Sequence, residues 1–374
     1  MELMFFICAA SFIYSFIGYP LIIGLLARKN GTPDLLHNRL PELTVILCVY
    51  NASPLLSFRI KNILESDYPT EKINILVVSD GSTDGPEHIV DSLNNPLVKL
   101  IHYSKNQGKS FALNQGLRAV ETDLVAFTDI RQRFDKHALM QLSSHFLDPK
   151  TAAVTGNLHI ITDENNTEDD PGLYWKYEKW IREKESDFKS MLGVTGAIYM
   201  ARRNLIPEIP TDIILDDMYI PLTMVNAGYH IKFENKAIAY DVSSSTTAEE
   251  FHRKVRTLAG NFQLISYMPW LLSPRKNPLF FQFVSHKVMR LIMPYCLIAL
   301  LVSSYLINTT NFFLLFLLQI LFYLYTAIAY IAAINNIKMP FSSVFISFCS
   351  LHIASFLAGW KYKFSDTKTL WKKH

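Results

Sequence analysis

The chain places long apolar runs at its two ends and a mixed polar segment between them. Residues 5–26 carry no charge and are long enough to cross a hydrocarbon core of about 30 Å. Three more apolar runs follow near the C-terminus, at 291–307, 312–334 and 344–360. The stretch from about residue 31 to 267 contains no comparable run. The pattern predicts a globular domain between an uncleaved N-terminal anchor and C-terminal membrane spans.

Within the polar stretch, short apolar runs alternate with amphipathic segments. The runs 41–49, 73–78, 98–102 and 124–128 are too uniformly apolar for half-exposed strands and predict buried ones. The segments between them predict helices at 57–65, 88–93 and 109–120. Such alternation is typical of a parallel sheet with helical crossovers.

Farther along, the pattern is more varied. It predicts a helix over 134–146, a strand over 152–160, an acidic loop at 163–171 and an amphipathic helix over 173–187. Together these patterns divide the chain into an anchor (1–29), a globular domain (30–267), interfacial linker helices (268–290), and a C-terminal region (291–374) of two or three spans and a basic tail.

The distribution of charge predicts how the chain is oriented in the membrane, and the cysteines give no sign of disulfides. The net charge of +3 gives no indication of nucleic-acid binding, and the four cysteines lie in apolar runs without C-x-x-C spacing. Cations flank the globular domain at Arg28 and Lys29, and at Lys276, Lys287 and Arg290, which predicts that it faces the cytoplasm. Four full crossings would put the C-terminal lysines outside. Either the last apolar segment is interfacial or re-entrant, or this preference is overridden.

Acidic residues stand where buried strands end. Asp80 and Asp84 lie in Ser79-Asp80-Gly81-Ser82-Thr83-Asp84, directly after the run 73–78. Ligand sites of open α/β sheets lie at such ends. The alternative is a turn rich in Asp, Gly and Ser that caps the next helix. A second acidic pair, Asp216-Asp217, and a basic pair, Arg253 and Arg256, follow.

Taken in order, these segments resemble the inverting family-2 glycosyltransferases of GT-A fold, the superfamily that includes cellulose, chitin and hyaluronan synthases. The resemblance spans nearly the whole chain. It implies an α/β fold, with a Rossmann-like nucleotide-sugar-binding GT-A domain and α-helical transmembrane segments. It also implies a hexosyl- or N-acetylhexosaminyltransferase.

The resemblance assigns the donor-binding residues. Tyr50, Asn51 and Asp80 match the strand-end segments, and Asp80 would hydrogen-bond the uracil or ribose. Lys109 stands in a segment similar to the family's G-K-x-x-A-L-N, at a helix N-terminus where it could face phosphate. The alternative for Lys109 is a solvated first-turn lysine. Ala52 replaces the acid that usually follows the asparagine.

Asp129 stands where the family usually shows D-x-D, whose two acids hold a divalent metal on the diphosphate. Arg131 replaces the second acid. Either Asp129 still binds Mg²⁺ or Mn²⁺ with help from phosphate and water, or Arg131 partly takes over the neutralisation of charge. We expect a retained but weaker metal site at Asp129.

The remaining matches concern the acceptor and the leaving group. Thr195, Gly196 and Ala197 resemble a segment that lines the acceptor side, although a tight strand turn would look the same. In the family's acidic pair the second acid, here Asp217, is the general base. Asp216 would then lie on the acceptor side or serve as the N-cap of a helix over 218–225.

Arg253 and Arg256 stand in place of the Q-x-x-R-W motif of processive synthases, with Arg256 matching its arginine and expected to clamp the diphosphate. Because Thr257 replaces the tryptophan, processivity is an open question. A basic helix face that touches lipid is the alternative, and it suits Lys254 best.

The sequence thus predicts transfer of a sugar, from a nucleotide-sugar donor that we expect to be UDP-linked, to a hydroxyl of a growing polysaccharide or lipid-linked glycan at the cytoplasmic membrane face. Membrane lipids and a homo-oligomer or export partner would complete the system. Two alternatives stay open: a polyprenyl-phosphate monosaccharide transferase, and a catalytically inactive nucleotide-sugar-binding subunit of a synthase complex.

Overall fold

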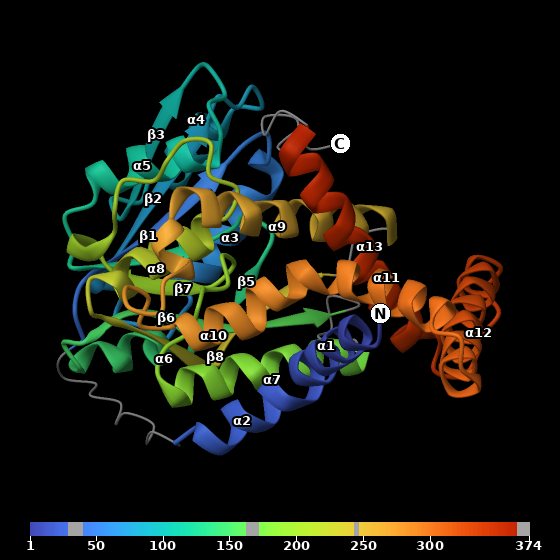
Figure 1. Cartoon of the computed structure of the whole chain (residues 1–374). Coiled ribbons are helices and arrows are strands. Elements are labelled where there is room, and N and C mark those ends of the chain that lie inside the picture. Colours follow the sequence, from blue (N-terminus) through green and yellow to red (C-terminus); the bar gives the residue numbers. More distant parts are fainter. Residues whose placement is uncertain (29–39, 162–171, 243–246, 365–374) are drawn as a thin grey trace. The chain divides into compact units, whose positions relative to one another are not determined.

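The computed structural model describes residues 1–28, 40–161, 172–242 and 247–364 (Figure 1). The chain forms two compact units. One, here called the helical unit, comprises Met1–Leu26, Pro171–Lys184 and Ser245–His374. The other, the sheet unit, comprises Ala27–Asp170 and Glu185–Ser244. The acidic loop predicted at 163–171 lies outside the described residues.

The sheet unit is built on an eight-stranded sheet, counted over the described residues, in the order β3-β2-β1-β4-β7-β6-β8-β5. Its strands are β1 Leu43–Val49, β2 Ile73–Asp80, β3 Val98–Tyr103, β4 Leu124–Thr128, β5 Arg133–Phe134, β6 Thr151–Ile161, β7 Tyr199–Arg202 and β8 His230–Val242. β1 pairs in parallel with β2 and β4, and β2 with β3, which confirms the predicted parallel sheet. β7 is antiparallel to both of its neighbours.

Helices cover both faces of the parallel strands. They are α3 Ser53–Leu64, α4 Pro86–Leu93 and α5 Lys109–Ala119, followed in the sheet unit by α6 Ala138–Ser144 and α8 Asp216–Asn226. Val45 and Leu47 of β1 share a core with Leu56, Ile60 and Ile63 of α3. On the other face Ile46 meets α5 at Gly116, where a Cβ would lie 3.3 Å from the isoleucine. Alternate residues of β1 are thus buried on opposite faces, as a central strand requires.

The predicted helix over 134–146 starts later than the pattern indicated. Phe134 belongs to β5 and pairs with Ala239 of β8, and α6 begins only at Ala138. The apolar side chain of Phe134 fits a buried strand as well as a helix, and the pairing partner, about a hundred residues away in the chain, selects the strand.

The helical unit contains the apolar segments. α1 Glu2–Ile13, a π-helical turn Tyr14–Gly18 and α2 Tyr19–Leu26 form one helix, and α10 Phe280–Gln282, the π-helical turn Phe283–Val288 and α11 Met289–Leu306 form a second. α12 Thr310–Ile334 and α13 Ser342–Phe364 follow. In the described residues these are four helices long and apolar enough to cross a membrane.

Two further helices belong wholly or partly to this unit, α7 Gly172–Phe188 and α9 Thr247–Tyr267. Glu178 of α7 is buried and forms an ion pair with Arg290 and a 3.3 Å contact with His286. Small and aliphatic residues of α13 pack on Val255, Leu258 and Ala259 of α9. The apolar helices are therefore tied to amphipathic ones by both an ion pair and a hydrophobic core.

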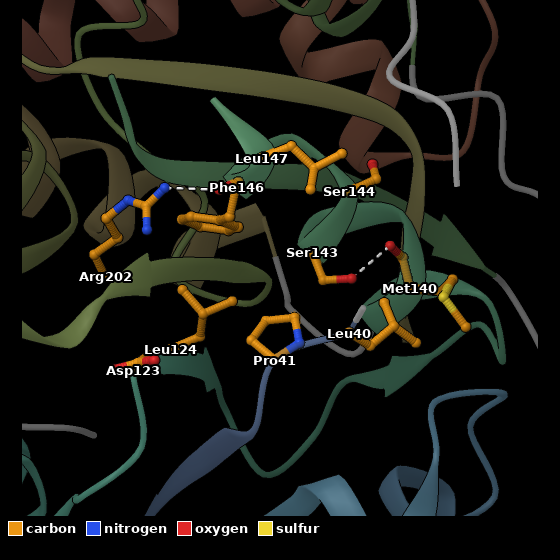
Figure 2. Close-up of a pocket in the computed structure, with 10 residues that line it drawn as sticks. All are labelled: Leu40, Pro41, Asp123, Leu124, Met140, Ser143, Ser144, Phe146, Leu147 and Arg202. Carbon is orange, nitrogen blue, oxygen red and sulfur yellow. Dashed lines mark hydrogen bonds between the residues drawn. The ribbon is translucent and has the colours of Figure 1, made fainter. Parts of the chain in front are cut away.

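A small cavity of ≈ 170 Å³ lies at the amino ends of β1 and β4 (Figure 2). Leu40, Leu124 and Phe146 line it, and Arg202 at its edge donates hydrogen bonds to the backbone carbonyls of Phe146 and Asp148. Its polar groups are thus engaged in holding the fold, and Asp80 and Asp129 lie at the opposite, carboxyl edge of the parallel strands.

Candidate active site at the carboxyl edge of the sheet

The loops after β1 and β2 are adjacent in the sheet and are bound to each other. The Asn51 amide donates to Ser82 Oγ at 3.1 Å, and Asn51 Oδ1 accepts from the Thr83 amide at 2.8 Å. The Ser53 amide, at the start of α3, donates to Asp84 Oδ2 at 2.8 Å. Asp84 therefore accepts a hydrogen bond from a free amide at the N-terminus of α3. It does not bind α4, the helix that follows it in sequence, in this way. The alternative reading of this segment as a structural turn holds for Asp84.

Asp80 is buried and binds the loop that precedes α5. Its carboxylate accepts hydrogen bonds from the Gln107 and Gly108 amides, both at 2.8 Å, and from Asn106 Nδ2 at 3.0 Å. The loop passes so close that a Cβ on Gly81 would lie 2.3 Å from the Asn106 nitrogen. Since a carboxylate has about four acceptor positions, most of those of Asp80 are used within the protein. Its contact with the donor stays a prediction.

The loop held by Asp80 places Lys109 at the first position of α5. Lys109 Nζ forms a 2.9 Å ion pair with Asp129 Oδ1, just beyond the end of β4, and is only one-third exposed. Burial alone would lower the pKa of Lys109, but Asp129 and Asp216 raise it above its usual value. The lysine is thus a fixed cation at the sheet edge and not the solvated side chain of the alternative reading.

Gly196 lies between this cation and the predicted base. A Cβ on Gly196 would lie 3.9 Å from Lys109 Nζ and 4.0 Å from Asp217 Oδ2. The segment around it is fixed, because the Val194 amide donates to the Asp217 carbonyl at 2.8 Å and the Thr195 amide to Thr155 Oγ1 at 2.8 Å. The Ala197 carbonyl accepts from Thr128 Oγ1 at 2.9 Å. Residues from three distant parts of the chain therefore meet at one point.

The acidic pair opens α8. Asp216 and Asp217 are both in its first turn, and the residue at the N-cap is Leu215, without a side-chain cap. The interpretation of Asp216 as an N-cap is wrong, because Asp216 already has helical backbone geometry. Both carboxylates instead stand in the first turn, at the positive end of the helix dipole.

The side chains of Cys48 and Tyr199 respond to the negative charge of this edge. Burial raises the pKa of the Cys48 thiol to about 12; Lys109 opposes the rise, while Asp129, Asp216 and Asp80 add to it. Burial also raises the pKa of Tyr199 well above its usual value, with contributions from Asp216 and Asp217. All four predicted acids therefore act on the same small region.

Arg131 lies near an acid of a distant strand. Its guanidinium lies 3.7 Å from Asp241 of β8, and the same carboxylate accepts a 2.9 Å hydrogen bond from Gln132. Over the part of the chain that the structure describes, no group of three or more His, Cys, Asp or Glu side chains is arranged to hold a metal ion. Asp129, with one oxygen on Lys109, fits a divalent cation only as a single carboxylate ligand.

Arg253 and Arg256 lie on α9 in the helical unit, the first exposed and the second half-buried. Lys254, for which contact with lipid was the alternative, forms a 2.8 Å ion pair with Glu250 one turn earlier. The role of the two arginines at the diphosphate stays a prediction. Tyr50, exposed at the end of β1, and Thr195 likewise keep their predicted roles as predictions.

Sequence reasoning gave no role of their own to two residues that hold this part of the fold together, Asn114, which ends the matched G-K-x-x-A-L-N segment, and Arg59. Asn114 of α5 is buried and exchanges two hydrogen bonds with the backbone of Ile209, in the segment leading to α8. Arg59 of α3 is 0% exposed and donates to Thr128 Oγ1 at 2.7 Å. A signal for Arg59 existed, because it stands in the apolar stripe of α3 between Leu56 and Ile63.

Comparison with known proteins agrees with this geometry. Residues 44–209 match the sequence model for glycosyl transferase family 2, and residues 127–337, more than half of the chain, match that for glycosyl transferase family group 2.

Among characterised relatives, the poly-beta-1,6-N-acetyl-D-glucosamine synthase of Staphylococcus aureus (strain COL) is 25% identical over 243 residues, covering 63% of this chain and 58% of that protein. The enzyme of the same name from Staphylococcus epidermidis is 23% identical over 235 residues, covering 61% and 57%. The chain thus spans less than two thirds of the length of these relatives.

Among solved structures, the mannosyltransferase PcManGT from Pyrobaculum calidifontis, in complex with GDP-Man and Mn²⁺, has a TM-score of 0.73 and 20% identity, covering 98% of this chain and 99% of that one. At that identity the likeness establishes the GT-A fold alone. The parallel strands, the acids at their carboxyl edge and the family match lead to one conclusion: this chain belongs to the family-2 glycosyltransferases and is a glycosyltransferase.

Proposed function

We propose that this chain transfers an N-acetylhexosamine, with inversion, from a UDP-linked donor to a hydroxyl of a growing polysaccharide or lipid-linked glycan. One observation carries the proposal: the point beside Gly196 lies about equally far, 3.9 and 4.0 Å, from a cation and a carboxylate. A cation is suited to phosphate and a carboxylate to a hydroxyl proton. The choice of sugar is supported by the relatives named as N-acetylglucosamine polymer synthases.

In this proposal Asp217 is the general base. It takes the proton of the acceptor hydroxyl as the oxygen attacks the anomeric carbon, and the bond from that carbon to the diphosphate breaks with UDP as the leaving group. A single displacement inverts the configuration. Thr195, Gly196, Ala197 and Asp216 would line the acceptor side, and the absence of a side chain at Gly196 leaves room for the hydroxyl.

On the donor side, Lys109 would neutralise part of the diphosphate charge. Tyr50, Asn51 and the remaining acceptor capacity of Asp80 would contact the nucleoside. Arg131, Arg253 and Arg256 are proposed to hold the departing UDP, a task for which a guanidinium fork suits better than an ammonium.

A divalent cation is part of the proposal as a weakly held ion with Asp129 as its protein carboxylate and donor phosphate and water as its other ligands. When bound it would neutralise diphosphate charge. Mn²⁺ is present with the donor in the structural neighbour. We expect excess chelator to lower kcat/KM of the wild type by roughly tenfold or more, and Asp129→Asn to abolish this response. Full activity of the wild type in excess chelator would remove the ion from the mechanism.

We also propose that the chain is an integral membrane protein whose catalytic domain faces the cytoplasm, where nucleotide sugars are made. The four apolar helices and the cations that flank the globular domain in sequence support this. Four helices are too few to enclose a wide sugar channel within one chain, so product export would require a second copy or a partner protein.

The test incubates membrane vesicles that contain the full chain with a panel of radiolabelled UDP- and GDP-sugars, and Asp217→Asn vesicles serve as the control. The proposal expects incorporation from UDP-N-acetylhexosamine into glycan, with release of UDP that depends on Asp217. Label found solely in a monosaccharide-lipid would select the polyprenyl-phosphate alternative. Donor binding without UDP release for every sugar would support the inactive-subunit alternative.

A further inference from the structure

Arg59 of α3 is a fully buried cation directly behind the proposed site. Its side chain lies over the ring of Phe134, 4.2 Å from the ring centre, and donates hydrogen bonds to Asn62 Oδ1 and to Thr128 Oγ1. Over the described residues no carboxylate oxygen pairs with Arg59 within 4 Å, and its Nε is buried without a hydrogen-bond partner. Burying a charge without a direct counter-ion opposes folding, which calls for a compensating role.

The carboxylate of Asp129 stabilises the positive charge of Arg59. Burial lowers the pKa of Arg59 to about 9, and the carboxylate of Asp129 acts in the opposite direction. The guanidinium is therefore charged at neutral pH. Asp129 thus interacts with two cations, with Lys109 in direct contact and with Arg59 at longer range.

Thr128 connects Arg59 to the segment that contains Gly196. Its Oγ1 accepts the hydrogen bond from Arg59 at 2.7 Å and donates its own proton to the Ala197 carbonyl at 2.9 Å. A hydroxyl that both accepts and donates is fixed in orientation, so it defines the distance between the end of β4 and the segment that holds Gly196. Thr128 immediately precedes Asp129, and Ala197 immediately follows Gly196.

We propose that Arg59 is a positioning residue that, through Thr128, holds the donor-side acid Asp129 and the acceptor-side glycine Gly196 in register for transfer. This inference deepens the proposed function and rests on it. The alternative is that Arg59 only stabilises the fold. Its neighbour Asn62 has such a structural role, since it exchanges two hydrogen bonds with the backbone of Phe134 away from the proposed site.

The test uses the purified full chain and the conservative series Thr128→Ser and Thr128→Val. Thr44→Val is the matched control, because the Thr44 hydroxyl is buried and forms a 2.8 Å hydrogen bond with Thr122 at the opposite end of the parallel strands. Steady-state assays give kcat and donor KM, and hydrogen–deuterium exchange follows residues 193–198. Arg59→Lys, which keeps the charge and loses the fork, is made alone and with Thr128→Val.

We expect Thr128→Val to lower kcat about tenfold with donor KM within about twofold, the size expected for one buried hydrogen bond. It should also speed exchange over residues 193–198. Thr128→Ser should remain near wild type, and Arg59→Lys should add little to Thr128→Val, because both break the same connection. Thr44→Val should change neither kcat nor that exchange.

Equal effects of Thr128→Val and Thr44→Val on kcat and exchange would overturn the inference, as would full additivity of the double variant. If Arg59→Lys fails to fold, the threonine series still decides. Failure of the wild type to transfer any sugar would instead count against the proposed function. The exchange measurement, which needs no turnover, would then still test the connection between Thr128 and the Gly196 segment.

Discussion

Two acids of the candidate site, Asp80 at the end of β2 and Asp217 in the first turn of α8, have different surroundings in the fold. The first is proposed for the donor side and the second for the acceptor side. The Asp80 carboxylate is buried and binds two backbone amides and one side-chain amide of the loop before α5. The Asp217 carboxylate lies beside Gly196, where there is no side chain, and its backbone carbonyl makes the structural bond to Val194. The same residue type therefore organises the fold in one place and, in the proposed reaction, acts on the acceptor in the other.

The difference explains how a site can be both rigid and reactive. Charge-assisted bonds from Asp80 fix the start of α5 and, with it, Lys109. The segment around Gly196 is fixed instead by hydrogen bonds from the Val194 and Thr195 amides, and Asp217 contributes its backbone carbonyl to this. If Asp217 is the base, as proposed, substitutions at the two acids should have different effects on stability and on catalysis.

The largest effect is expected from Asp217→Asn. An amide cannot take the acceptor proton, so kcat should fall about a thousandfold, in the range found for general bases, while donor affinity and the thermal unfolding midpoint stay near wild type. Single-turnover transfer assays with a donor-binding titration measure this. Asp216→Asn is the neighbouring control and should lose far less; equal loss in the two variants would contradict the assignment of the base to Asp217.

Asp80→Asn should show the opposite signature. Its amide group places a donor where the loop amides also donate, so we expect a loss of about 2 kcal/mol in the free energy of unfolding. A raised donor KM should accompany this loss because Lys109 is no longer held. Calorimetric unfolding and steady-state kinetics are the measurements. An unchanged unfolding midpoint would show that the bonds of Asp80 to the loop are not structural.

Gly196→Ala tests the space on the acceptor side. The added methyl meets Lys109 Nζ and Asp217 Oδ2 at ordinary contact distances, so the fold should tolerate it, but acceptor kcat/KM should fall roughly tenfold because the hydroxyl position is filled. Gly228→Ala is the matched control. Gly228 has φ +89 and nothing within 4 Å of the added Cβ, so that variant should lose about 1 kcal/mol of stability and no activity. If Gly196→Ala kept the wild-type kcat/KM, the acceptor hydroxyl would not bind beside Gly196.

The smallest effect concerns Cys48, which lies among the charges of both sides. Because its pKa is raised to about 12, the thiolate is scarce at neutral pH and forms only as the pH rises toward that value. Alkylation of Cys48 by iodoacetamide at pH 8, followed by mass spectrometry, should be slower than that of a free thiol. Lys109→Met should slow it further by removing the cation that favours the thiolate. Faster alkylation in that variant would contradict a stabilising effect of Lys109 on the Cys48 thiolate.

Much of this molecule is determined locally by its sequence. The family resemblance, and with it the enzyme class, rested on short motifs in a fixed order. Each of these depends on neighbouring residues alone.

Only the tertiary structure decided how the polar residues pair. The motif at Asp80 gave no sign that its carboxylate binds the loop at 106–108, and Arg131 pairs with Asp241 of a strand more than a hundred residues later. The helix pattern of α3 did not say that Arg59 reaches Thr128, nor did any spacing bring Gly196 between Lys109 and Asp217. Hydrophobic burial follows a periodicity that can be read along the chain, whereas hydrogen bonds and ion pairs are short-ranged and directional, so their partners exist only once distant segments have packed.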